Sequence, residues 1–164
     1  ISAGADMIND IWGLKYDPTM SSVIAKADIP VCIMHNRNNS EYKDLIKDVI
    51  SDLKESIDIA LSAGISKDNI IIDPGIGFAK NYNENLTLIN RLEQLHILGY
   101  PLLLGTSRKS VIGTALDLPV NERLEGTLAT TAMAYMKGAM FIRVHDVKEN
   151  YRLIQMLNKI KAEH

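Results

Sequence analysis

The chain has 164 residues, of which 46% are hydrophobic and 23% charged, and its formal net charge is −2. This length predicts one globular domain. A charge so close to zero disfavours a nucleic acid or an anionic membrane surface as a partner. The longest apolar runs fall far short of the roughly 20 residues that cross a bilayer. We therefore expect neither a nucleic-acid-binding protein nor a membrane span.

Cysteine usage and the first residues bear on the compartment. Cys32 is the single cysteine, which excludes an intramolecular disulfide and a multi-cysteine metal site. The segment 1–6 has neither the basic start nor the apolar centre of a secretory signal. The sequence thus predicts a cytoplasmic protein, and its opening reads like the end of a helix that runs into a strand.

Short apolar runs alternate with amphipathic segments along the chain. The runs predict strands at 7–8, 30–34, 70–72, 102–104 and 141–144, and the amphipathic spacing predicts helices at 18–27, 42–61, 86–95, 128–136 and 147–160. This alternation is typical of an α/β protein with a parallel sheet, because a crossover helix returns the chain to the same sheet edge. Consecutive apolar residues predict strands that are covered on both faces.

The spacing of the predicted strands allows two architectures. Successive strands begin about 33 residues apart, and eight such units amount to roughly 270 residues, the size of a (β/α)8 barrel. Five units also fit an open doubly wound sheet. Spacing alone leaves both open.

Polar residues follow every predicted strand, and in a parallel α/β fold such strand ends face one side. We therefore expect them to converge on one site. They are Asn9-Asp10, His35-Asn36, Asp73-Pro74-Gly75, Gly105-Thr106-Ser107-Arg108-Lys109-Ser110 and Arg143-Val144-His145-Asp146.

Each of these residues also has a purely structural interpretation. Asp73 before Pro74-Gly75 is good turn chemistry, and Asn9 or Asp10 can cap a helix or turn. Ser107 can cap the next helix, although a capped helix start is also an anion site. Taken alone, His35 and His145 are more often packed histidines than catalytic ones.

The chemistry of the set favours a ligand with two different parts. A buried carboxylate at Asp73 suits the paired N–H donors of an amino-pyrimidine edge, and Phe78 offers an aromatic face. The cations Arg108, Lys109 and Arg143 suit phosphate or carboxylate groups. Because no paired His/Cys spacing exists, any metal is expected to be Mg²⁺ held mainly by ligand phosphates and water.

Five motifs, taken in order, closely resemble the dihydropteroate synthase family, the sulfonamide-sensitive enzymes of folate synthesis. They are Asn9-Asp10-Ile11-Trp12, Met34-His35-Asn36, Asp73-Pro74-Gly75-Ile76-Gly77-Phe78, Ser107-Arg108-Lys109-Ser110 and Arg143-Val144-His145-Asp146. Each piece is weak alone, but the ordered set is specific and covers essentially the whole chain.

The resemblance implies a (β/α)8 TIM barrel that condenses 6-hydroxymethyl-7,8-dihydropterin pyrophosphate with p-aminobenzoate to 7,8-dihydropteroate and pyrophosphate. It also implies the site residues. The catalytic set is Asp73, Lys109, Arg143 and His145. The pterin-binding set is Asn9, Met34, Asp73, Phe78, Gly105, Lys109 and Arg143. Ser107, Lys109 and Ser110 would bind p-aminobenzoate, and Arg143 and His145 would bind pyrophosphate.

One departure from the family is large. Its opening segment, which carries a Mg²⁺ ligand, has no counterpart here, so residues 1–164 are expected to be the C-terminal portion of one barrel domain, with strands 4–8 present and strands 1–3 absent. We expect no metal ligand in this chain, no turnover from it alone, and a homodimer for the full-length protein.

Two other functions remain open. A non-catalytic pterin or methyl-folate binding module would share the pterin site, but has no need of the segments at Ser107 and Arg143. A phosphosugar barrel enzyme would use the cations, but gives no reason for Asp73 or Phe78.

Overall fold

The computed structural model describes residues 1–163 and contains five parallel strands. The first three form one sheet in the order β1-β2-β3, and the last two pair as β4-β5. A parallel bridge between Ile72 and Leu102 joins the two groups, so the strand order follows the sequence. The prediction of a parallel α/β sheet is confirmed. The strands are β1 (Ile8–Asp10), β2 (Val31–Met34), β3 (Ile70–Asp73), β4 (Leu103–Leu104) and β5 (Phe141–Ile142).

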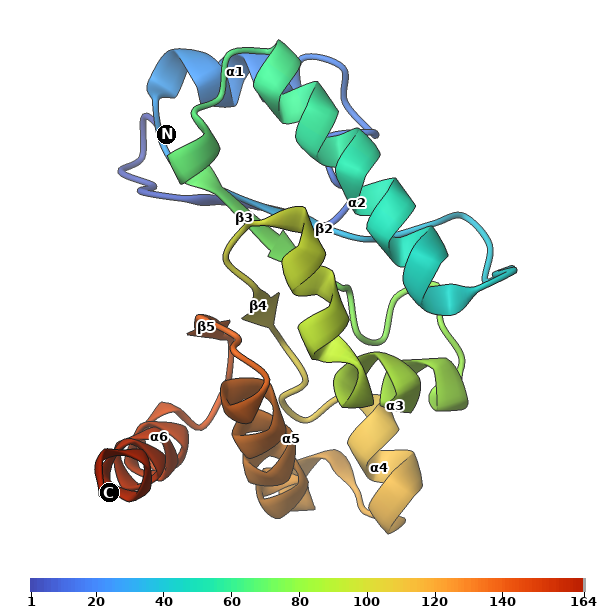
Figure 1. Ribbon diagram of the computed structural model, residues 1–164, viewed down its shortest axis with the longest axis vertical. Helices are drawn as coiled ribbons and strands as arrows, with labels where there is room; N and C mark the ends of the chain where they lie inside the picture. The colour runs from blue at the N-terminus through green and yellow to red at the C-terminus, as the bar shows by residue number, and fades with distance from the viewer. Residues whose placement is uncertain (164) are drawn as a thin grey trace.

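Helices follow each strand, and Figure 1 shows α2 and α3 lying against the same side of the strands. Helix α2 begins at Asp44, whose side chain accepts a hydrogen bond from the backbone of Lys47, and carries a regular apolar face. The helices are α1 (Met20–Ala27), α2 (Leu45–Ser62), α3 (Tyr82–Asn90), α4 (Ser110–Leu116), α5 (Leu124–Met136) and α6 (Val147–Ala162), with short 3-10 segments η1 (Lys67–Asn69), η2 (Leu92–Leu98) and η3 (Val120–Glu122).

Some predicted boundaries were wrong. The helix expected at 86–95 is α3 followed by η2, and it starts earlier because Asn81 and Glu84 form a capping box. The strand expected at 141–144 ends at Ile142. Helix α4 had not been predicted as a separate element, because its apolar face is only seven residues long.

The strands divide their side chains between two faces by strict alternation. The face beneath the helices belongs to the large core, which includes Val31, Ile33, Ile70, Ile72 and Leu104. The opposite face carries a smaller buried cluster of Cys32, Ile71 and Leu103. By the same alternation and the strand register, this second face also carries Asn9, Met34, Asp73, Gly105, Phe141 and Arg143.

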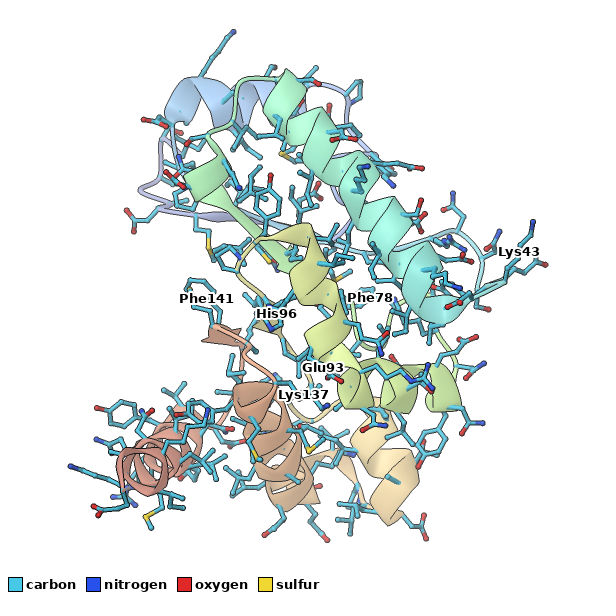
Figure 2. All side chains as sticks on the ribbon, viewed as in Figure 1. Lys43, Phe78, Glu93, His96, Lys137 and Phe141 are labelled. Atoms are coloured by element: carbon cyan, nitrogen blue, oxygen red, sulfur yellow. The ribbon has the colours of Figure 1, made fainter. Side chains whose placement is uncertain are left out.

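Coverage on both faces, which the apolar runs predicted, holds for β2 and β3 but not for every strand. Both are buried throughout. In contrast, Asn9 in β1 is exposed and Phe141 in β5 is 39% exposed. Figure 2 shows Phe141 standing off β5 on the side away from α3. The prediction was wrong for β1 and β5, because the described residues leave the face opposite the helices open to solvent at Asn9 and Phe141.

A polar link fixes the end of α5 to η2. Lys137 Nζ lies 2.7 Å from Glu93 Oε2, and the Nε2 atom of His96 lies 2.8 Å from the carbonyl oxygen of Lys137. Figure 2 shows these side chains between α3 and α5. The link sets the position from which the chain enters β5. No helix within residues 1–163 has the length and apolar character needed to cross a membrane.

Candidate functional site

Asp73 is the buried carboxylate of the strand face that the helices leave free. It is the last residue of β3, is 7% exposed and lies opposite Met34 of β2. Its Oδ1 atom accepts a 2.7 Å hydrogen bond from the backbone N–H of Gly75, while no residue among 1–163 donates to Oδ2. The turn role is therefore real, and it leaves one carboxylate oxygen open to a ligand.

Burial opposes the ionisation of Asp73, whereas the charged groups around it favour ionisation. Burial raises the pKa of Asp73 to about 6, against the lowering effect of the Gly75 hydrogen bond and of the cations Lys109, Lys80 and Arg143. These cations lie close enough to act on its charge, yet none is within ion-pair distance. A ligand that brings N–H donors would stabilise the ionised form of this buried carboxylate.

Position 75 requires glycine because of its backbone conformation and because of the close approach of His35. Its φ angle is +70°, and a Cβ atom there would overlap the carbonyl oxygen of His35. That close approach is possible because the end of β2 packs directly on the turn after β3, where the N–H of His35 donates to the Asp73 carbonyl over 2.8 Å. Glycine is thus required here for both reasons.

Lys109 and Phe78 meet over the same turn. The Lys109 ammonium donates to the carbonyl oxygen of Ile76 and lies 5.0 Å from the centre of the Phe78 ring. Burial lowers the pKa of Lys109, although the Asp73 carboxylate acts to raise it. Lys109, Phe78 and Asp73 are therefore brought together, as the resemblance implied.

Met34, Gly105, Arg143 and Asn9 share the face of Asp73. A Cβ atom on Gly105 would stand 3.8 Å from that of Arg143, so these two residues are direct neighbours across β4 and β5. Asn9 pairs in register with Cys32, two residues before Met34, and so lies deeper along the strands than Asp73.

Ser107 and His145 are joined, but not as the sequence suggested. Ser107 Oγ lies 2.9 Å from His145 Nδ1 and accepts a 3.1 Å bond from the His145 backbone N–H. The expectation that Ser107 caps the following helix was wrong, since α4 begins at Ser110 with Lys109 in the cap position and no side-chain cap bond. The physical reason is that Ser107 lies two residues before the cap position, where His145, in the turn after β5, is the partner of its hydroxyl.

The segment that carries Ser107 is held by α5 and by β5's following turn. Arg108 has a φ of +58°, its N–H donates to Thr127 Oγ1, and its guanidinium forms two bonds with Asp146. The carbonyl oxygen of Arg108 accepts from Arg123. Arg108 is therefore occupied structurally, which leaves Lys109, Lys80 and Arg143 as the cations that act on Asp73.

A polar cluster beside the site was missed by the sequence analysis. His35 is 2% exposed and lies between Asp52 Oδ2 and the Lys80 ammonium, at 2.9 Å from each, and Arg37 also bonds Asp52. Burial lowers the pKa of His35 to about 4 and that of Lys80 to about 7. His35 was expected among the polar strand ends, but nothing in the local sequence links it to Asp52, Arg37 or Lys80.

Mg²⁺ ligands do not gather in residues 1–163. This ion prefers carboxylate and other oxygen ligands, yet Asp10 is bonded to the N–H groups of Trp12 and Leu14, and Asp146 to Arg108. No group of three or more acidic, histidine or cysteine side chains in the described chain is placed to hold a metal. The described residues do not form a magnesium site by themselves.

Comparison with known proteins agrees with this geometry. The family model described as pterin binding enzyme matches residues 1–145. Over 161 residues the chain is 58% identical to a dihydropteroate synthase of Clostridium beijerinckii, covering 98% of this chain and 60% of that protein. The chain thus spans about 60% of the length of that relative.

Solved structures give the same result in three dimensions. A dihydropteroate synthase of Clostridium difficile in the presence of pteroic acid superposes with a TM-score of 0.95 at 46% identity, covering 99% of this chain and 62% of that one. A dihydropteroate synthase of Xanthomonas albilineans in complex with 7,8-dihydropteroate gives 0.95 at 35% identity, with the same coverage.

Proposed function

The chain belongs to the pterin-binding enzyme family, and on that basis we propose that it serves as a dihydropteroate synthase. In this role it would join the dihydropterin of a pyrophosphate ester to p-aminobenzoate and release pyrophosphate. The observation that carries the proposal is Asp73: a carboxylate with 7% exposure, an unengaged Oδ2 and three nearby cations.

The pterin end of the site follows from Asp73. Its oxygens would accept the paired N–H donors of the amino-pyrimidine edge. Phe78 and Met34 would then face the ring system, and Asn9 would add an amide deeper along the strands. When the pyrophosphate leaves first, positive charge develops on the pterin, and an ionised Asp73 stabilises it from a fixed position.

The other end of the site is cationic. Arg143 lies beside Gly105, and His145 is held by Ser107. In the proposed reaction both side chains would contact the departing pyrophosphate. Lys109 would bond the pterin and border the p-aminobenzoate. Ser107 and Ser110 would receive its carboxylate at the start of α4, although the Ser107 hydroxyl already bonds His145.

Finer points of the proposal concern the whole protein. We propose that residues 1–164 are the C-terminal portion of one (β/α)8 barrel domain, and that their five strands are strands 4–8. Sequential, all-parallel strand order supports this arrangement. A cytoplasmic location, a homodimer, sulfonamide sensitivity and Mg²⁺ held by the pyrophosphate stay predictions.

A non-catalytic pterin-binding module is the second candidate. It would use Asp73 in the same way, but nothing in it explains why Arg143 and Lys109 lie near that carboxylate. The cationic end therefore favours the synthase.

An activity assay separates the candidates. The full-length gene product, supplied with 6-hydroxymethyl-7,8-dihydropterin pyrophosphate and p-aminobenzoate, should form 7,8-dihydropteroate and pyrophosphate, and a sulfonamide should compete with p-aminobenzoate. Asp73→Asn should abolish the reaction. Pterin binding without any turnover would support the binding module and overturn the synthase.

A further inference from the structure

Lys80 lies just after the segment 75–79, and the proposed chemistry gives it no contact with a substrate. Its Nζ atom donates to the carbonyl oxygens of Gly75, over 3.1 Å, and Phe78, over 2.9 Å. It also lies 2.9 Å from Nδ1 of His35. A charged lysine has three N–H donors, so here each donor meets one acceptor.

The partners of His35 determine which ring nitrogen accepts from Lys80. Nε2 lies 2.9 Å from a carboxylate oxygen of Asp52, and a carboxylate only accepts. Nε2 therefore carries the proton, and Nδ1 offers its lone pair to the ammonium. The guanidinium of Arg37 donates to the same Asp52 oxygen over 2.5 Å and so helps to hold the carboxylate that orients His35.

The segment that Lys80 holds has an unusual backbone. Gly75, Gly77 and Ala79 all have positive φ angles, and alanine seldom adopts that region. Side chains from four other positions bond its main chain. Asp73 accepts from Gly75 N–H, Lys109 donates to the Ile76 carbonyl, Asn85 accepts from Gly77 N–H, and the Tyr42 hydroxyl donates to the Ala79 carbonyl.

Such a backbone persists only where its surroundings fix it. Among the bonds just described, those of Lys80 differ because they reach both ends of the Gly75–Phe78 turn and tie it to the end of β2. One end of that turn donates to Asp73, and the other carries the Phe78 ring. A shift of the turn would therefore move both groups.

We propose that Lys80 is a positioning residue of the pterin site: its ammonium clamps the Gly75–Phe78 turn onto His35 and so sets where Asp73 and Phe78 meet the ligand. Lys80 itself would not touch the pterin. The inference rests on the proposed function for the identity of the ligand, whereas the clamp on the turn can be measured without any ligand.

The test compares Lys80→Met with Lys43→Met in the full-length gene product. Methionine keeps an unbranched apolar side chain but removes the donors, and Figure 2 shows Lys43 extending away from the molecule ahead of α2. Hydrogen exchange is measured without ligand, and the Kd of 6-hydroxymethylpterin by calorimetry. We expect Lys80→Met to speed exchange at 75–78 and to raise the Kd, each at least tenfold, while amides of α6 change less than twofold. Lys43→Met should change neither.

A second pair tests the His35 link. His35→Asn keeps an acceptor close to the position of Nδ1, whereas His35→Leu removes it. We expect the pterin Kd of His35→Asn to stay within threefold of the unsubstituted protein and that of His35→Leu to rise as in Lys80→Met. Equal losses in both variants would remove His35 from the clamp.

Several outcomes would overturn the clamp. One is an unchanged pterin Kd in Lys80→Met; another is exchange that accelerates equally throughout the chain, which indicates general destabilisation. Failure of the unsubstituted protein to bind pterin would instead overturn the proposed function, and the exchange measurement would still decide whether Lys80 holds the turn.

Discussion

Ser107 and His145 are bound to each other twice, through the backbone N–H of His145 over 3.1 Å and through its Nδ1 atom over 2.9 Å, both to the Ser107 hydroxyl. The two residues are 38 positions apart in sequence and are brought together by the pairing of β4 with β5. A single hydroxyl therefore fixes both the main chain and the ring of the histidine that would contact pyrophosphate.

Replacing Ser107 by alanine should free that ring. The His145 N–H is only partly buried, so losing its partner should cost about 0.5–1.5 kcal/mol of stability, and a misplaced His145 should lower turnover by roughly tenfold or more. Thermal unfolding and steady-state kinetics of the full-length gene product would check both. Ser62→Ala, at an exposed position in the last turn of α2, is the matched control. Turnover equal to that of the control would contradict the prediction.

The pterin affinity should depend on pH through Asp73. Its pKa is about 6 in the folded protein, and the amino-pyrimidine edge needs the ionised form. Affinity should therefore rise with pH, levelling above about 6, and below that value weaken by up to about tenfold per pH unit because a proton must leave. Calorimetry between pH 5 and 8 measures this. An affinity that improved on acidification would contradict the assignment.

Lys109 should matter to the chemical step. It lies near both Asp73 and Phe78, and loss of one preorganised donor costs on the order of 2–4 kcal/mol in the transition state. Lys109→Ala should accordingly reduce kcat by about 30-fold to 1,000-fold. Lys43→Ala, at an exposed position, serves as the control. Near-equal rates in the two variants would show that Lys109 has no such role.

Gly75→Ala should destabilise the fold more than Gly64→Ala. Both residues have positive φ angles, of +70° and +93°, so both substitutions strain the backbone by about 1 kcal/mol. A Cβ atom at Gly64 has no neighbour within 4 Å, whereas at Gly75 it overlaps the His35 carbonyl. Chemical denaturation should show an additional loss of roughly 1–3 kcal/mol for Gly75→Ala. Equal losses would mean that the turn can move away from β2.

Stability should fall in acid because of His35. Its pKa is about 4 in the folded protein and about 6.5 when unfolded, so the unfolded state binds the proton first. The contribution of neutral His35 is complete above about pH 6.5 and is lost as the pH falls toward 4, up to about 3 kcal/mol. Unfolding free energies measured across this window should show a smaller loss for His35→Asn, and an identical loss would refute the assignment.

Local patterns in the sequence were enough to predict the order of strands and helices. The short apolar runs at β2 and β3 and the amphipathic spacing of α2 come from neighbours within a few positions, so the parallel α/β fold follows from the chain itself. The ordered motifs that contain Asp73 and Lys109 pointed in the same way to the pterin-binding family, whose model covers residues 1–145.

Only the tertiary structure decided which of these side chains act on one another. Ser107 binds His145 and Lys80 binds His35 across 38 and 45 positions, and neither pairing follows from local spacing. For Asp73 the sequence predicted a buried ligand-binding carboxylate, with a turn role as the alternative, but it could not predict the pKa of that group. Burial raises the pKa of Asp73 while Lys109, Lys80 and Arg143 lower it, and both effects depend on distances that exist only once the strands have come together.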